Sequence, residues 1–204
     1  HTKAEVMLIT RPRRFGKKLG MSMLEAFFDI RKDHRALFEG LEIASHPALC
    51  AAWMNQYPTV FITLRQVEGL NFQDAYGQLL YEIALLYQEH AYVLNGASMS
   101  EPEKQLYRRL MNREANRTDV LRSIEFLTQV LHKHYGRKVI LLMDEYDVPV
   151  AKANTNGYYQ EMLDVMKGLM RAVKDNASLQ FAIITGCLKI AKESIFTGTN
   201  NFVS

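Results

Sequence analysis

The stretch that decides the fold is VMLITRPRRFGKKLGMSML, residues 6–24. It begins with an apolar run, continues through a basic loop and ends in a segment whose apolar residues recur at helical spacing. A phosphate-binding loop follows the pattern G-x-x-x-x-G-K-[ST] in the same strand–loop–helix context. Gly16 and Lys17 match the closing glycine and the lysine, whereas Arg11 stands at the opening glycine and Lys18 at the hydroxyl residue. The pattern is therefore a half match, which its context strengthens.

The chemistry of such a loop is phosphate binding. Its backbone N–H groups and the N-terminus of the following helix attract phosphate oxygens, and its lysine contacts the outer phosphates. The residues expected to bind a nucleotide are Arg13, Arg14, Phe15, Gly16, Lys17, Lys18 and Leu19. The alternative is a basic surface turn or a short nucleic-acid patch built from the same cations. Both interpretations predict an anionic ligand.

Four short apolar runs are typical of buried parallel strands, because none shows a steady polar alternation. They are residues Val6–Thr10, Thr59–Leu64, Lys138–Glu145 and Leu179–Gly186. Helical segments separate the runs, which predicts a doubly wound α/β sheet with right-handed crossovers. We therefore expect a single domain over residues 1–204, with a mostly parallel sheet.

The segments between the runs carry apolar stripes at helical spacing, and we expect these stripes to pack into the core. The stripes are Leu19, Met23, Phe27 and Ile30, with Leu24 and Phe28 beside them; Ala75, Leu79, Ile83, Leu86 and Tyr87; Val120, Ile124, Leu127 and Leu131; and Tyr158, Met162, Met166, Leu169 and Val173. A further helix is predicted to begin at Ser100, because Glu103 completes a capping box. The polar stretch 95–117 around it predicts a helical insertion or a surface excursion.

Two carboxylates end the third apolar run, in VILLMDEYD, residues 139–147. Ligands of open α/β sheets bind at the carboxyl ends of the strands, where the basic loop also lies. There Asp144 can hold Mg²⁺, and Glu145 can orient or deprotonate an attacking water. The alternative is a strand that merely ends in polar residues. Asp147 either assists the metal or caps the following turn.

The fourth apolar run ends in Thr185 and Gly186. A polar residue at this tip, beside the two carboxylates, can touch the γ-phosphate or the attacking water, so Thr185 joins Glu145 as a predicted catalytic residue. Lys189 lies close enough in sequence to reach a phosphate. The alternative for all three residues is a tight turn that requires Gly186.

Composition excludes several classes of protein. Of the 204 residues, 48% are hydrophobic and 23% are charged, as in ordinary globular proteins, and the net charge of +3 neither demands nor excludes a nucleic-acid partner. Cys50 and Cys187 lie far apart without a CxxC motif, which indicates free thiols in a reducing compartment. No apolar run approaches the roughly 18 residues of a membrane span, and no signal peptide is visible at the start. We expect a cytoplasmic protein without a membrane partner.

The chain resembles the AAA-ATPase-like family of bacterial proteins. The resemblance rests on TRPRRFGKKLGMSML (10–24), VILLMDEYDVPV (139–150) and ITGCLKIAKESIFTGTNNF (184–202). It implies a P-loop NTPase three-layer sandwich of the additional-strand type, with ATP as ligand, Mg²⁺ at Asp144 and hydrolysis through Glu145. Members often continue into a helical lid and a PD-(D/E)XK nuclease-like domain, so residues 1–204 are expected to be a fragment that lacks both.

Lys18 departs from the family pattern, which has Ser or Thr at this position. That hydroxyl is a Mg²⁺ ligand, and a lysine would bring a competing positive charge to the metal. Two functions follow: an ATP-hydrolysing conformational switch, or a non-hydrolysing module that serves as a scaffold or regulatory domain. The expected partners are a nucleotide, together with a protein or the downstream nuclease-like domain. Direct nucleic-acid binding by the basic loop ranks below both.

Overall fold

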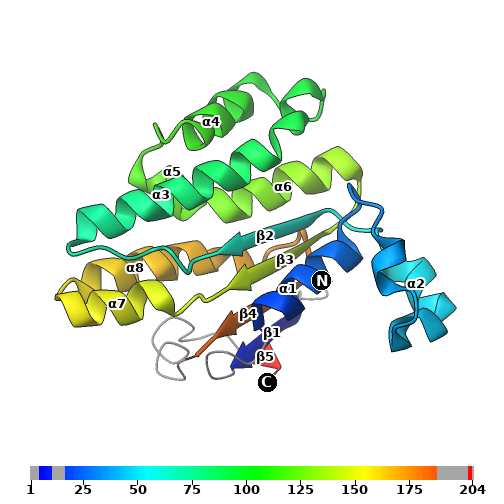
Figure 1. The fold of residues 1–204 in the computed structure, drawn as a ribbon. Helices are drawn as coiled ribbons and strands as arrows, with labels where there is room; N and C mark the ends of the chain where they lie inside the picture. The colour runs from blue at the N-terminus through cyan, green and yellow to red at the C-terminus, as the bar shows by residue number, and fades with distance from the viewer. Residues whose placement is uncertain (1–4, 11–16, 188–201, 204) are drawn as a thin grey trace.

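The computed structural model describes residues 5–10, 17–187 and 202–203. Its strands form one parallel sheet in the order β2-β3-β4-β1-β5 (Figure 1). The strands are β1 (Glu5–Thr10), β2 (Thr59–Thr63), β3 (Val139–Asp144), β4 (Leu179–Gly186) and β5 (Phe202–Val203). The four predicted runs are confirmed to within a residue at each end. The short strand β5 was not predicted, because two residues are too few to show a pattern.

The register of the sheet brings the carboxyl ends of four strands to one edge. Thr10 at the end of β1 pairs with Gly186 at the end of β4. On the other side of β4, Met143 pairs with Ile184, one residue before β3 ends. β4 therefore lies between β1 and β3, so the carboxyl ends of β1 and β3 flank its tip.

Helices connect the strands and cover the sheet. The α-helices are α1 (Lys17–Phe28), α2 (Pro47–Trp53), α3 (Phe72–Glu89), α4 (Glu101–Met111), α5 (Arg117–Leu121), α6 (Ser123–Tyr135), α7 (Val148–Asn156) and α8 (Tyr159–Leu169). Short 3-10 helices are η1 (Arg35–Phe38), η2 (Glu42–Ser45), η3 (Ala91–Asn95) and η4 (Met170–Val173). None of the helices in the described part of the chain has the length and apolarity needed to cross a membrane.

The sheet is buried on both faces, as its apolar strands require. In β3, Val139, Leu141 and Met143 pack into the larger core, to which α3, α6 and α8 contribute. The alternate residues Ile140 and Leu142 pack into a smaller core with α1 on the opposite face. The described residues thus form a helix–sheet–helix sandwich.

The predicted buried face of α1 is confirmed only in part. Phe28 is buried in the smaller core, and Leu24 and Phe27 pack against it. Leu19 and Met23 were also expected in the core, but they are 67% and 41% exposed, and Met21, which was not predicted, is buried instead. The helix α1 carries apolar residues of its own on several sides, so their spacing alone does not decide which of them face the sheet.

The other stripes are confirmed as core, although one of them spans two helices. The residues predicted for the segments around α3 and α8 are all buried. So are Val120, Ile124, Leu127 and Leu131, but α5 ends at Leu121 and α6 begins at Ser123, with a break at Arg122.

The polar segment 95–117 forms a second layer outside α3 (Figure 1). The predicted capping box is confirmed, since the Ser100 backbone N–H donates to Glu103 Oε2 at 2.8 Å. The helix it starts, α4, buries Tyr107 and Leu110. The Tyr107 hydroxyl donates to the backbone oxygen of Tyr87 at 2.7 Å, which satisfies both groups in the interior. The excursion is therefore docked on the domain.

The C-terminal end of α1 is held by the segment before β2. The Asn55 side-chain amide donates to the backbone oxygens of Ala26 and Asp29, at 3.0 Å each. The backbone N–H groups of Asn55 and Tyr57 donate to Phe27 and Phe28 at 2.6 and 3.0 Å. Carbonyl groups that the end of a helix leaves without partners are thus satisfied. This anchors α1, whose other end follows the basic loop.

Candidate functional site

Asp144 and Thr185 lie side by side at the tips of β3 and β4. The Thr185 hydroxyl donates a hydrogen bond to Asp144 Oδ1. The two residues are 3% and 2% exposed, so water does not compete strongly for this contact. Neighbouring parallel strands that end together place both groups here. The bond fixes the orientation of the Asp144 carboxylate.

Glu145 directly follows β3 in a left-handed backbone conformation, with φ of +55°. Its N–H donates to Thr185 Oγ1 at 3.4 Å, and the next N–H, from Tyr146, donates to the Thr185 backbone oxygen at 3.1 Å. A left-handed non-glycine residue costs about 1–3 kcal/mol, and such residues cluster at functional sites. The Glu145 carboxylate is half-buried and makes no hydrogen bond or ion pair with the described residues. Its side chain is thus available to a ligand.

Asp147 ties the segment after β3 to the end of β4. Its buried carboxylate accepts a hydrogen bond from the Cys187 backbone N–H at 2.9 Å. Asp147 occupies the N-cap position of α7 but makes no side-chain capping bond there. The interpretation of Asp147 as a turn cap is therefore wrong, because its acceptor atom is used between two strand ends.

Gly186 is required by packing. A Cβ atom at this position would lie 2.4 Å from Cε1 of Tyr146 and 2.8 Å from Asp147 Oδ1. The Tyr146 side chain is fully buried. Burial, and next the negative charge of Asp147, raise the pKa of the Tyr146 hydroxyl, which stays neutral. The buried Tyr146 ring thus packs against Gly186, at the tip of the neighbouring strand. The sequence pattern did not single out Tyr146.

The structure describes only part of the predicted phosphate loop. Arg13, Arg14, Phe15 and Gly16 lie outside the described residues, as do Arg11 and Lys189. Lys17 is the first residue of α1, and Lys18 and Leu19 are exposed in its first turn. Residues 11–16 connect the end of β1, beside the β4 tip, with this helix start. Helix N-termini attract anions through their unpaired N–H groups.

The donor atoms at the strand tips suit a hard cation. Asp144 Oδ2 forms no hydrogen bond with the described residues, while Oδ1 is held by Thr185. Carboxylate oxygens of this kind are preferred Mg²⁺ ligands. Lys18 can supply no ligand oxygen. The residues present therefore fit one protein carboxylate on a metal, with Glu145 beside it.

A second group of carboxylates lies elsewhere and is already paired with cations. Glu25, Asp29 and Glu89 bring carboxylate oxygens within 4.8 Å of one another. Arg31 pairs with Asp29 at 2.7 Å and with Glu89 at 2.6 Å, and Lys32 pairs with Glu25 at 2.6 Å. Two cations thus occupy the places that a metal would need. The cluster links α1 to α3 as an ion-pair network.

Known proteins resemble this chain over nearly all of its length. The model of a family described as "Predicted AAA-ATPase" matches residues 1–196. An "Uncharacterized protein in vnfD 5'region" of Azotobacter chroococcum mcd 1 is 28% identical over 195 residues, which cover 95% of this chain and 32% of that protein. The chain therefore spans about a third of the length of this relative. No solved structure matches the chain.

Proposed function

Because the chain belongs to the family of predicted AAA-ATPases, we propose that it binds ATP at the carboxyl edge of its sheet and hydrolyses it as a conformational switch. The observation that carries the proposal is the junction of Thr185, Asp144 and Glu145 at the tips of β4 and β3. The strand order supports it, since β4 lies between the strand before the basic loop and the strand before the carboxylates. We therefore extend the proposal to the additional-strand type of P-loop sheet that the family resemblance implies.

The basic loop and the start of α1 would hold the phosphates. Lys17 would contact the β- and γ-phosphates, and Arg13 and Arg14 would add positive charge. The backbone of residues 13–19 would supply N–H donors at the helix N-terminus, where anions are stabilised. Loss of the Lys17 charge alone is therefore expected to abolish binding of the nucleotide.

Asp144 would hold Mg²⁺ through Oδ2, and the metal would supply charge neutralisation at the phosphates. Glu145 would orient the attacking water and accept its proton, for which its half-buried carboxylate is available. The left-handed backbone at Glu145 sets where that carboxylate lies.

Thr185 has a positioning role in this proposal. A hydroxyl group has a single O–H to donate, and that of Thr185 is donated to Asp144. It could donate to a γ-phosphate only by releasing Asp144. We therefore assign Thr185 to holding the metal ligand and to linking it with β4, in place of the direct phosphate contact that its sequence position suggested.

The second candidate is a module that binds nucleotide without hydrolysing it. Lys18 is the observation that favours it, because it replaces the hydroxyl ligand of the metal and lies in the first turn of α1. The two candidates differ in whether the present chain turns over ATP.

Phosphate release from ATP should be measured for the unaltered chain, Glu145→Gln and Lys18→Thr, with and without Mg²⁺. Hydrolysis by the unaltered chain that requires Mg²⁺ and is lost in Glu145→Gln would support the switch. Activity that arises only in Lys18→Thr would support the non-hydrolysing module. Turnover that is unchanged in Glu145→Gln would remove Glu145 from the mechanism.

A further inference from the structure

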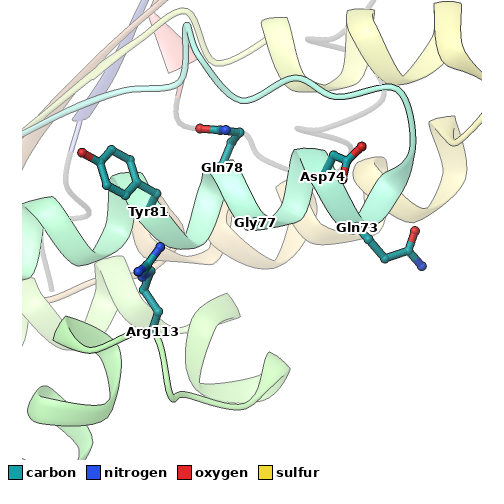
Figure 2. A pocket seen from close by; sticks show the side chains of 6 residues that line it. All are labelled: Gln73, Asp74, Gly77, Gln78, Tyr81 and Arg113. Carbon is teal, nitrogen blue, oxygen red and sulfur yellow. The ribbon is translucent and has the colours of Figure 1, made fainter.

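A polar groove lies on the side of α3 turned away from the sheet (Figure 2). Its volume is about 590 Å³. It is lined by Gln73, Asp74, Gly77, Gln78, Tyr81 and Arg113. The first five belong to α3, and Arg113 reaches toward them from the segment after α4. None of the six belongs to the candidate nucleotide site.

Arg113 occupies a backbone position that favours glycine. The N–H of Glu114 donates to the Arg109 oxygen at 2.8 Å, and that of Arg113 donates to the Leu110 oxygen at 3.3 Å. This is the Schellman pattern at a helix end, in which the residue in left-handed conformation is most often glycine. Arg113 adopts it with φ of +63°. Arginine is less stable than glycine in this backbone conformation, which indicates that the Arg113 side chain has a function.

The Arg113 side chain is directed into the groove. Its guanidinium carbon lies 6.0 Å from the centre of the Tyr81 ring, the outer limit of a cation–π contact. Within the part of the chain that the structure describes, Arg113 has no carboxylate partner, whereas its neighbours Arg108 and Arg109 pair with Glu101 and Asp119. The cation is therefore available to an acidic ligand.

Gly77 is a second locally unfavourable residue in the same groove. It lies in the interior of an 18-residue helix, where glycine is less stable than alanine. A Cβ atom at Gly77 would meet no protein atom within 4 Å, so intramolecular packing does not require glycine. Residues that break a local rule without a structural reason are expected at functional sites. Arg113 and Gly77 are two such residues, and both line this groove.

We propose that this groove binds an extended acidic segment of a partner protein, with a carboxylate on Arg113 and the peptide main chain over Gly77. Arginine matches carboxylates in geometry and charge. The amides of Gln73 and Gln78 can donate to and accept from peptide groups. Asp74 lines the same groove, so a ligand carboxylate must lie on the Arg113 side, away from Asp74. This requirement favours a peptide with isolated acidic residues over a nucleic-acid backbone, whose charges are closely spaced.

The test is selection of phage-displayed random dodecapeptides on the chain, followed by anisotropy titration of the enriched peptides. The variants are Arg113→Asn, which removes the charge but tolerates the left-handed backbone, and Gly77→Leu, which fills the groove floor. Each is expected to weaken binding by about tenfold or more. Arg122→Gln, which removes an arginine charge outside the groove, should bind as the unaltered chain does.

Folding is monitored through variants that should not lose stability. Arg113→Gly and Gly77→Ala relieve the two local costs and are expected to raise the Tm, while Arg113→Gly still loses peptide binding. ATP titration should be the same for Arg113→Asn and the unaltered chain.

Three outcomes would overturn the proposal. They are the absence of any enriched peptide, enriched peptides without Asp or Glu, and equal peptide binding by the unaltered chain and both variants. Binding of a dT20 oligonucleotide that depends on Arg113, with no peptide enriched, would assign the groove to nucleic acid instead.

Discussion

Thr185 donates its hydroxyl hydrogen to Asp144 Oδ1 and accepts the backbone N–H of Glu145 on the same oxygen, at 3.4 Å. One buried hydroxyl thus joins the last residue of β3, the residue that follows it and the tip of β4. A movement of the β4 tip would be transmitted to the carboxylate proposed to hold the metal. This gives the proposed switch a physical connection between the site and the sheet.

Thr185→Val removes the hydroxyl while it keeps the branched shape of the side chain. Asp144 Oδ1 would then lose its donor in a buried setting, which costs about 1–3 kcal/mol of unfolding free energy. Urea denaturation measures the loss, and Thr185→Ser, which keeps the hydroxyl, should stay close to the unaltered chain. If Thr185→Val were as stable as Thr185→Ser, the hydrogen bond to Asp144 would not contribute to the stability of the fold.

Glu145→Gly separates stability from function. Glycine adopts the left-handed backbone at this position without the steric cost, so the free energy of unfolding should rise by about 0.5–1 kcal/mol. ATP turnover, if the unaltered chain has it, should fall to the level of Glu145→Gln. A Glu145→Gly chain that is less stable would show that the left-handed conformation is not strained.

Gly186→Ala tests the contact between the two strand tips. The new methyl group would meet the buried Tyr146 ring at 2.4 Å, and overpacking of this kind costs roughly 1–3 kcal/mol. The control is Gly20→Ala in α1, where a Cβ meets no atom of the described residues within 4 Å and helix propensity should add up to ~1 kcal/mol. Chemical denaturation of the two variants should therefore shift in opposite directions. A neutral Gly186→Ala would mean that Tyr146 can move aside.

His90 makes stability depend on pH. Burial, and next the positive charge of Arg31, lower the His90 pKa to about 4. The positive charge of Lys32 also lowers this pKa, whereas the negative charges of Glu89 and Asp29 raise it. The unfolded chain binds this proton near its ordinary pKa of about 6.5. The stabilising contribution is therefore complete above that pH and is lost as pH falls toward 4. Between pH 7 and pH 5 the loss is about 1–2 kcal/mol.

The measurement is urea denaturation at pH 7 and pH 5 for the unaltered chain and His90→Phe, which keeps an aromatic ring but cannot titrate. Between pH 7 and pH 5 the unaltered chain should lose about 1–2 kcal/mol more of its free energy of unfolding than His90→Phe does. His46→Asn, at an exposed position, should follow the unaltered chain at both pH values. An equal loss in the two chains would show that folding does not lower the pKa of His90.

The strands β1 to β4 were predictable because their apolar runs have one explanation, burial on both faces of a parallel sheet. The helices were less so. In α1 apolar residues point to several sides, and the choice of Met21 over Leu19 as the buried residue depends on contacts with β3 that spacing does not encode. The helix α2 was not predicted, because none of its residues is buried and it therefore carries no core stripe.

The sequence predicts which residues meet at the site, but not which hydrogen bonds they form. That Asp144 and Thr185 meet follows from strands that end at one edge. The Thr185 hydroxyl donates its one hydrogen to Asp144 because of the orientation of its side chain, which its sequence position does not determine. The packing of Tyr146 against Gly186 likewise arises only when both strand ends are in place.

The central claim is that the loop between β1 and α1 binds ATP with help from the carboxylates after β3. Calorimetric titration with ATP, with and without Mg²⁺, tests it most directly. The comparison is between Lys17→Ala, at the start of α1, and Lys138→Ala, which removes the same charge next to the opposite end of β3. We predict binding that tightens with Mg²⁺, vanishes in Lys17→Ala and persists in Lys138→Ala. Equal binding by the two variants, or none by the unaltered chain, would contradict the account.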